Sequence, residues 1–489
     1  MKDLLKFLVI IFCSSNFTFA QQDTLKYWIQ FTDKNNSSFS IQNPEQFLST
    51  KAILRRLKSH IPITIQDLPV NEAYIIRIAS FPSVSILNPS KWFNSITISC
   101  SDTNDLNQIL LLPFVKKAEL VQRMKLKNDT KFLEKIINSE EKNEIEITTN
   151  IHYPYGYSFN QSHLHHIEHL HNLGFNGEGL TIAVIDAGFE NAQNMTCFKD
   201  LFQSNRVIST KDFVDHDGDV YADHYHGTAV LSTIAGKIEG QYFGTATEAS
   251  FHLLRSENAT TETIIEEDNW VTAAEYADSV GADIINSSLG YTTFDDSLQN
   301  HTYSDLNGNT TRIAIAADIA ASKGILVVAS AGNSGADAWR YISTPADADS
   351  ILTVGAVDSL GNYAFFSSVG PSSDGDIKPN VASVGFGTYL FIPYNENVVK
   401  GNGTSFSSPM MAGMVACLWQ ALPELNNMEI IDLIQKSSNQ FSAPDSLLGY
   451  GIPNFEKAYS SIKGNQDTIS DFEIISIYPN PVEEINLKY

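Results

Sequence analysis

The sequence predicts an α/β protein, in which a three-layer, doubly wound, mostly parallel sheet follows a small α+β unit. Between about residues 150 and 462, continuous apolar strands alternate with helical segments. This alternation is typical of a parallel sheet that helices cover on both faces. Between about residues 21 and 125, apolar residues recur with a period of 2 in some short segments and of about 3.6 in others, as in strands and helices. With 489 residues the chain has room for two or three domains.

The composition favours an exported globular protein and argues against several kinds of partner. The formal net charge is −24, from 32 basic and 56 acidic residues, which argues against nucleic acid and anionic membrane surfaces as partners. Hydrophobic residues make up 43% of the chain and charged residues only 18%, as expected for a large core. Beyond the N-terminus there is no apolar run of about 20 residues, so we expect no membrane span after signal removal.

Residues 1–20 predict a secretory signal peptide. Lys2 and Lys6 provide a positive start, the apolar stretch over 7–13 is too short to span a bilayer, and Ala20 offers a cleavage point. The alternative is a buried N-terminal helix. With a signal peptide, the protein is expected to be secreted or held at the cell surface. Signal removal leaves three cysteines, Cys100, Cys197 and Cys417. Because their number is odd and their spacing is not that of metal ligands, no disulfide scaffold is expected.

The elements of the α+β unit, residues 21–125, follow from the two periods. Alternation predicts strands over 26–31, 73–78, 93–99 and 118–121, and the helical period predicts helices over 43–58 and 105–112. Residues 126–150 are rich in Lys, Glu and Asn, which favours a solvated linker or a surface helix open to proteolytic processing.

The elements of the larger unit, residues 151–462, are longer and more apolar. Its predicted strands cover 180–186, 251–255, 283–286, 325–330 and 351–357, and its predicted helices cover 226–237, 270–280, 312–322 and 405–422. Sites in parallel sheets gather at the carboxyl ends of the strands. Asp186, Ser288 and Asn333 fall at such ends, so we expect them to lie near one another.

Three short strings present reactive side chains where a strand ends or a helix begins: Val184-Ile185-Asp186-Ala187-Gly188, His226-Gly227-Thr228-Ala229-Val230 and Gly403-Thr404-Ser405-Phe406-Ser407-Ser408-Pro409. A hydroxyl becomes a useful nucleophile when a histidine accepts its proton and a carboxylate holds that histidine in the right tautomer. Taken singly, each of these residues has an ordinary alternative role as a helix cap or a turn residue. Together they make peptide hydrolysis the leading hypothesis.

With Ser330-Ala331-Gly332-Asn333-Ser334-Gly335, these strings resemble the motifs of the subtilisin-like serine proteases over about residues 180–460. The order acid, histidine, serine is that of the family. The resemblance implies a subtilisin-like fold in which Ser405 attacks, His226 shuttles the proton and Asp186 orients the imidazole. It also implies that Asn333 and the backbone N–H of Ser405 form the oxyanion hole. The chain departs from the family at Ala229, where a histidine is more frequent.

The resemblance also implies where substrate binds. Ser288, Leu289 and Gly290 would form an edge that holds an extended peptide substrate. Ser330, Ala331 and Gly332 would form the opposing wall of the pocket for the residue before the cut bond. The chemistry needs no cofactor. Structural calcium is common in the family, and the weak metal candidates here are Asp215, Asp217 and Asp219, with an acidic solvated turn as the alternative.

The segments on either side of the catalytic unit also resemble parts of such proteases. Residues 21–125 resemble the family's propeptide, which assists folding, occupies the cleft as an intramolecular inhibitor and is cut away. The alternative is a permanent binding domain. Within residues 463–489, the string Ile477-Tyr478-Pro479-Asn480-Pro481 is similar to the opening of type IX secretion sorting domains. The match is either the truncated start of such a domain or accidental.

The sequence therefore predicts a secreted serine endopeptidase, made as an autoprocessed zymogen, that cleaves protein or peptide substrates through an acyl-enzyme intermediate. Two alternatives remain. A catalytically silent relative acting as a surface binding protein would not need the intact set of Asp186, His226, Asn333 and Ser405. An esterase or lipase of the α/β-hydrolase kind expects Gly-x-Ser-x-Gly and the order serine, acid, histidine, which this chain reverses.

Overall fold

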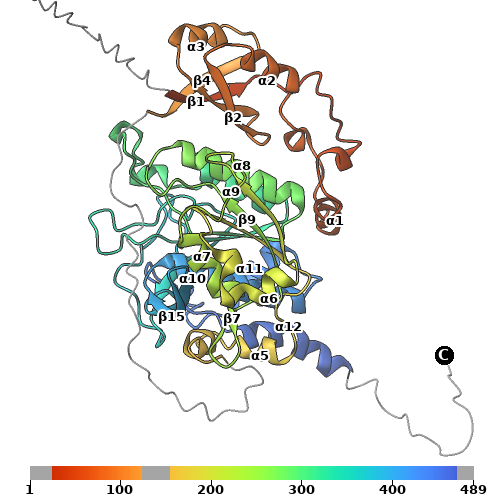
Figure 1. Ribbon diagram of the computed structural model, residues 1–489. Helices are drawn as coiled ribbons and strands as arrows, with labels where there is room; N and C mark the ends of the chain where they lie inside the picture. Colours follow the sequence, from red (N-terminus) through yellow and green to blue (C-terminus); the bar gives the residue numbers. More distant parts are fainter. Residues whose placement is uncertain (1–24, 124–154, 471–489) are drawn as a thin grey trace, which may run out of the picture.

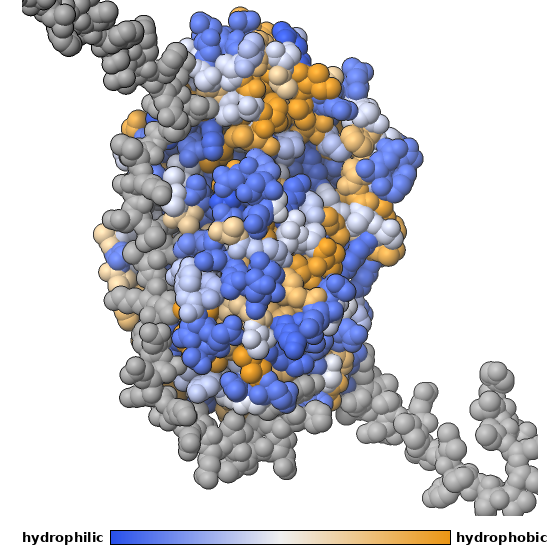
Figure 2. Space-filling model, in the orientation of Figure 1, coloured by the Kyte–Doolittle hydropathy of each residue, from blue (hydrophilic) through white to orange (hydrophobic). Residues whose placement is uncertain are grey.

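The computed structural model describes residues 25–123 and 155–470 as a small unit packed on a larger one (Figure 1). The predicted signal peptide, the linker over 126–150 and the start of the sorting domain lie outside these residues. In the part of the chain that the structure describes, no helix is long and apolar enough to cross a membrane. Figure 2 shows hydrophilic side chains over much of the visible face of the larger unit, in keeping with the high net charge.

The small unit is a four-stranded antiparallel sheet with helices on it. The strand order is β2-β3-β1-β4. The strands are β1 (Leu25–Phe31), β2 (Val84–Ser90), β3 (Ser95–Cys100) and β4 (Val115–Gln122), and the helices are α1 (Thr50–Lys58), α2 (Glu72–Ala79) and α3 (Thr103–Leu110). Ile29, Ile96, Ile98 and Ile109 are fully buried in its core. The predicted α+β class of this unit is therefore confirmed.

The predicted strand over 73–78 is wrong, because this segment forms helix α2. The Asn71 side chain accepts a hydrogen bond from the Ala73 backbone N–H and caps the helix, a signal that the run of β-branched residues obscured. Tyr74, Ile75 and Ile78 turn inward at helical spacing, and the Tyr74 ring stacks on Phe114 with centroids 4.2 Å apart. Packing against the sheet overrides the β propensity of isoleucine.

The predicted helix over 43–58 is also divided in the structure. A single 3-10 turn covers Pro44–Gln46, and α1 begins only at Thr50. Ser49 adopts an extended conformation and accepts a hydrogen bond from the Ala52 N–H, which starts the second segment.

The larger unit has a seven-stranded sheet in which every neighbouring pair is parallel, in the order β13-β12-β11-β10-β5-β9-β6. The strands are β5 (Thr181–Asp186), β6 (Val207–Asp212), β9 (Ser250–Arg255), β10 (Ile284–Ser287), β11 (Leu326–Ser330), β12 (Leu352–Val357) and β13 (Val381–Val384). All five predicted strands are present. The two edge strands, β6 and β13, were not predicted because one is half exposed and the other is only four residues long.

Helices cover both faces of this sheet, which confirms the predicted three layers (Figure 1). Along β5, Ile182 and Val184 pack on one face against α7 (His226–Ala235) and α10 (Thr404–Ala421). Ala183 and Ile185 pack on the other face against α8 (Ile265–Val280) and α9 (Arg312–Ser322). A strand buried on both faces has no polar alternation, and this explains why the strands are continuously apolar.

The remaining elements surround this core. They are the helices α4 (Phe159–His163), α5 (Glu168–Asn172), α6 (Lys199–Gln203), α11 (Asn427–Ser437) and α12 (Phe455–Ser470), and the hairpin strands β7 (Lys237–Ile238), β8 (Tyr242–Phe243), β14 (Thr388–Ile392) and β15 (Asn395–Gly401). The described cysteines Cys100, Cys197 and Cys417 are buried and free.

The small unit is held on α8 by ion pairs that are removed from water. Both carboxylate oxygens of Asp278 are used: Oδ1 lies 2.6 Å from Arg55 Nη2, and Oδ2 lies 2.9 Å from Arg56 Nη2 and 3.0 Å from Lys91 Nζ. Burial alone would raise the pKa of Asp278, but the three cations offset it and hold the pKa well below its usual range. One turn earlier, Glu275 accepts hydrogen bonds from the backbone N–H groups of Lys91 and Trp92.

Candidate active site

Asp186 and His226 are hydrogen-bonded in the interior of the larger unit. Asp186 is the last residue of β5, and His226 is the first residue of α7. Nδ1 of His226 lies 2.6 Å from Oδ1 of Asp186, and both side chains are fully buried. A carboxylate can only accept, so Nδ1 carries the proton that it donates, and Nε2 is left as the basic nitrogen.

Gly227 makes this close approach possible. A Cβ at this position would lie 2.3 Å from the carbonyl oxygen of Gly188 and 3.0 Å from the Cβ of Asp186. Any larger residue would push the start of α7 away from the acid. The glycine that follows the histidine is therefore a packing requirement of the Asp186–His226 pair.

Ser405 is the second residue of α10, and a proline later in the helix fixes its surroundings. Pro409 has no N–H to donate to the carbonyl of Ser405, four residues earlier. The hydroxyl of Ser288 replaces it and donates to the Ser405 carbonyl oxygen at 2.9 Å. In return, Ser405 Oγ lies 3.4 Å from the Ser288 carbonyl oxygen. The residue after β10 thus positions the start of α10.

The imidazole of His226 lies next to the start of α10. Its ring centroid is 6.3 Å from that of Phe406, the residue that follows Ser405. The end of β5 and the first turns of α7 and α10 therefore converge, as expected for carboxyl ends of parallel strands and the helices that follow them. Ser405 is only 4% exposed.

Asn333 follows β11 and faces the same helix start. Its Oδ1 accepts hydrogen bonds from the backbone N–H of Thr404 at 2.8 Å and from Thr404 Oγ1 at 2.9 Å. Because a backbone N–H can only donate, these contacts assign the oxygen of the amide, and Nδ2 is left as its donor group. Thr404 Oγ1 also accepts from the Gly332 N–H at 3.1 Å, which joins the loop to the helix.

A cleft with a volume of about 440 Å³ contains Ser405 and Asn333. Five of the six predicted substrate-binding residues line this cleft: Ser288, Leu289, Gly290, Ser330 and Gly332. Ala331 does not line the cleft; it is fully buried in a cluster with Leu306, Ile342 and Ala346. It supports the wall from behind.

The cleft also has polar residues that the sequence analysis did not single out. Glu257 and Glu262 contribute carboxylates to one part of the lining, and Asp337 contributes a third. Tyr291 Oη donates a hydrogen bond to Glu257 Oε2. Burial first, and then nearby carboxylates including Glu266 and Glu262, raise the pKa of Tyr291 well above its usual value. No spacing pattern in the sequence joins these residues; only the fold does.

The structure does not bring together the predicted metal candidates Asp215, Asp217 and Asp219. Asp215 instead forms an ion pair with Arg255, with 2.7 Å between Oδ2 and Nη1. The other two accept hydrogen bonds from backbone N–H groups in their own loop. The guanidinium of Arg255 thus supplies the positive charge beside Asp215. Among the described residues, three other groups converge: His163, His166 and Glu168; Glu257, Glu262 and Glu266; and Asp349, Asp374 and Asp376.

A family model described as the subtilase family matches residues 177–451, which is more than half of the chain. The chain belongs to the subtilase family. Family membership makes it a serine-type endopeptidase. A second model, the peptidase S8 propeptide domain of Bacteroidota, matches residues 26–136, so the small unit is a propeptide domain.

Known relatives of this subtilase are bacterial proteases. It is 31% identical over 291 residues to subtilisin DY of Bacillus licheniformis, covering 58% of this chain and 92% of the relative. It is 28% identical over 312 residues to the serine protease AprX of Bacillus subtilis, covering 58% of this chain and 66% of the relative. The crystal structure of MycP1 from the ESX-1 type VII secretion system has the same fold, with a TM-score of 0.50 and 22% identity over 66% of this chain and 89% of MycP1.

Proposed function

We propose that this subtilase is an exported protease precursor that cleaves peptide bonds through Asp186, His226 and Ser405. The observation that carries the proposal is the buried 2.6 Å hydrogen bond between His226 and Asp186, beside the first turn of α10, which holds Ser405. Nε2 of His226 accepts the proton from Ser405 Oγ as that oxygen attacks the substrate carbonyl carbon. Asp186 stabilises the imidazolium that forms and stays ionised.

The proton then moves on and the bond breaks. The imidazolium of His226 gives its proton to the leaving amine, the C–N bond breaks, and the acyl group remains on Ser405. A water molecule attacks this ester after losing a proton to His226, and the acid product leaves with Ser405 Oγ protonated again. No cofactor takes part in these steps, because the imidazole supplies and removes every proton.

The proposed oxyanion hole consists of Asn333 Nδ2 and the backbone N–H of Ser405. Replacing Asn333 by alanine is expected to lower kcat by about 100- to 1,000-fold with little change in KM, because the amide acts only as charge develops. Steady-state kinetics on a fluorogenic peptide measures this. Asn333→Asp is a matched variant that keeps the acceptor contact with Thr404 but has no amide donor, so it should lose activity too. Full activity in Asn333→Asp would exclude the assignment.

We also propose that the propeptide domain inhibits the cleft until the enzyme removes it. The end of β4 leads toward the catalytic unit: Gln299 Nε2 donates to the Leu120 carbonyl at 2.7 Å, and Arg123 Nε lies 3.2 Å from Asp296 Oδ2. The chain thus leaves the propeptide already attached to the protease surface. N-terminal sequencing of the purified, active protein tests this: a new N-terminus between about residues 125 and 155 is expected, and an unprocessed active chain would refute it.

Asp278 is expected to be essential for holding the propeptide in place. Asp278→Ala leaves Arg55 and Lys91 without a carboxylate partner, while Arg56 keeps Asp67, and this loss costs about 3–5 kcal/mol. The urea midpoint of the unprocessed precursor should fall accordingly. The control Asp432→Ala removes an exposed partner of Lys436 and should change stability by less than about 1 kcal/mol. Equal midpoints for the two variants would contradict the role of Asp278.

The carboxylates in the cleft favour substrates with a basic side chain. The lining includes Glu257, Glu262 and Asp337 but no lysine or arginine among the described residues. Opposite charges near a protein surface attract by about 1–2 kcal/mol after screening, which corresponds to roughly tenfold in kcat/KM. The segment proposed for processing includes Lys125 and Lys127, and either would suit a cleft lined by carboxylates.

Paired peptides test this preference. In a fluorogenic series, each position before the cut bond carries either lysine or its uncharged counterpart norleucine. We expect lysine to be preferred about tenfold at one position or more, and Glu262→Gln to remove that preference. Glu239→Gln, an exposed glutamate that does not line the cleft, should leave it intact. Preference for norleucine at every position would refute the basic substrate class while leaving the protease assignment standing.

A further inference from the structure

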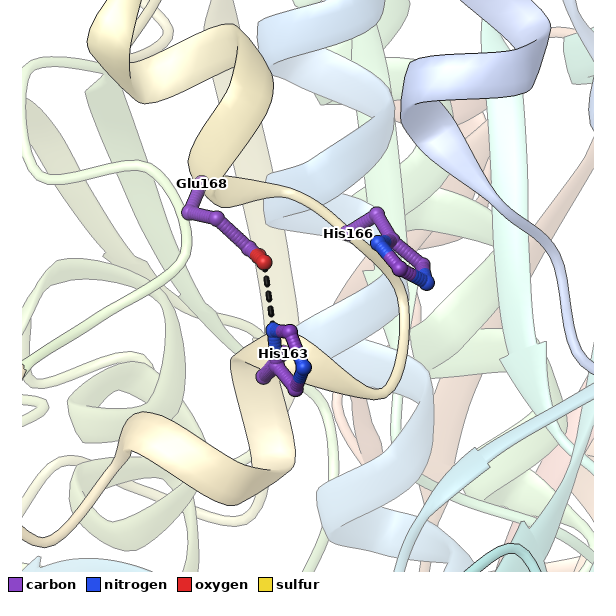
Figure 3. Close-up of side chains that lie close together, drawn as sticks. All are labelled: His163, His166 and Glu168. Atoms are coloured by element: carbon purple, nitrogen blue, oxygen red, sulfur yellow. Dashed lines mark hydrogen bonds and ion pairs between the residues drawn. The ribbon is translucent and has the colours of Figure 1, made fainter. Parts of the chain in front are cut away.

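Outside the active site, two histidines and a glutamate converge where α4 is joined to α5. His163 is the last residue of α4, His166 lies in the connecting loop, and Glu168 begins α5 (Figure 3). One ligand atom from each side chain lies within 4.8 Å of the other two. We call these three residues the His-His-Glu cluster.

The side chains of the cluster are already in contact, and a small rotation of the exposed histidines would turn these contacts into a ligand set. His163 Nδ1 lies 2.5 Å from Glu168 Oε1, and the His163 and His166 ring centroids are 5.3 Å apart. The second oxygen of Glu168, Oε2, is buried and accepts no hydrogen bond from the residues that the structure describes. A buried carboxylate oxygen without a partner costs free energy, and a bound cation would remove that cost.

A further carboxylate lies behind the cluster on α12. Glu456 Oε2 is 3.8 Å from Nδ1 of His166, and its Oε1 is 3.7 Å from Nδ1 of His169. A carboxylate on the Nδ1 side of a histidine favours the tautomer that leaves Nε2 to bind a metal, and raises its basicity. Glu456 is within ion-pair range of His166, and its half-exposed side chain has room to move into hydrogen-bond distance.

The donor atoms determine which ions fit. Two imidazoles and one carboxylate are preferred by Zn²⁺ and other late transition metals, whereas Ca²⁺ requires six or more oxygens. The His163 and His166 side chains are 52% and 42% exposed, so they have room to adjust, and water can occupy a fourth position. We propose that the His-His-Glu cluster binds one divalent transition-metal ion, and Zn²⁺ is the ion used to test it.

Such an ion would join the end of α4 to the start of α5. Both helices are only five residues long, and α5 packs against α10 and α12. Short helices gain little stability from their own hydrogen bonds, so a metal bridge would add stability to this part of the catalytic domain. The expected effect is on stability, and it is independent of the proposed catalytic mechanism.

Isothermal titration of the chelator-treated full chain with ZnCl₂ tests the proposal. A Ser405→Ala background prevents self-digestion. One Zn²⁺ should bind with a Kd at or below about 10 µM, raise the thermal midpoint, and resist competition by millimolar CaCl₂. The double variant His163→Asn/His166→Asn should bind at least 10-fold more weakly.

The chain offers a matched control. His60 is exposed, and like His166 it has a left-handed backbone, with φ values of 56° and 52°. Asparagine tolerates this conformation, so His60→Asn tests the substitution itself and should keep full affinity. Absence of Zn²⁺ binding at 100 µM, or equal affinity in the double variant, would overturn the proposal. Co²⁺ substitution gives a second readout, since a three-ligand site with water has visible absorption bands that the double variant should lack.

Discussion

Ser405→Ala is expected to abolish peptide hydrolysis and to leave the propeptide attached. The variant lacks the oxygen that attacks the substrate, so kcat should fall on the order of 10⁶-fold, a magnitude known from subtilisin rather than derived from this structure. The fold should be retained, because Ser405 lines the cleft and alanine occupies less space there than serine. Hydrolysis of a fluorogenic peptide and the mass of the purified chain measure the two effects.

Ser359→Ala serves as the control for this variant, because Ser359 is exposed and does not line the cleft. It should be processed and active like the wild type. If Ser405→Ala keeps even a hundredth of the wild-type rate, or releases a propeptide in the absence of other proteases, Ser405 is not the nucleophile.

Asp186→Asn is expected to lower kcat by about 10⁴-fold. An asparagine presents either its oxygen or its NH₂ to Nδ1, and the NH₂ orientation favours the tautomer with the proton on Nε2, where it blocks attack by Ser405. Asparagine also cannot stabilise the imidazolium. The loss should appear in kcat more than in KM, because Asp186 touches His226 rather than the substrate.

The pH dependence distinguishes this positioning role from a general loss of stability. Residual activity of Asp186→Asn should rise with pH where hydroxide replaces the missing base, whereas a partly unfolded enzyme would lose activity in proportion at every pH. Asp432→Asn, at an exposed site, should match the wild type. Wild-type kcat in Asp186→Asn would show that the carboxylate is not part of the catalytic group.

Much of the larger unit could be predicted from the sequence because burial on both faces makes its strands uniformly apolar. The predicted strand that ends at Asp186 is β5, and Ser288 directly follows β10, as expected from the strand ends. Since the carboxyl ends of parallel strands meet at one edge, the clustering of these residues followed from their positions alone. The order of the motifs then indicated the family.

Other features depend on contacts between distant segments that no local pattern encodes. The sequence shows Pro409 in a helix, but not that the Ser288 hydroxyl satisfies the carbonyl that it frees. It shows an acidic loop around Asp215, but not that Arg255 from a neighbouring strand neutralises it. In the propeptide, the Asn71 cap outweighed the β propensity of the residues after it.

The central claim is that Ser405 becomes a nucleophile because His226 and Asp186 lie at the start of its helix. Labelling of the processed protein with a fluorophosphonate, followed by peptide mass mapping, tests it most directly. We predict a single adduct on Ser405 in the wild type, and none when His226 is replaced by alanine. An adduct on another serine, or no adduct in a preparation that hydrolyses peptides, would contradict the claim.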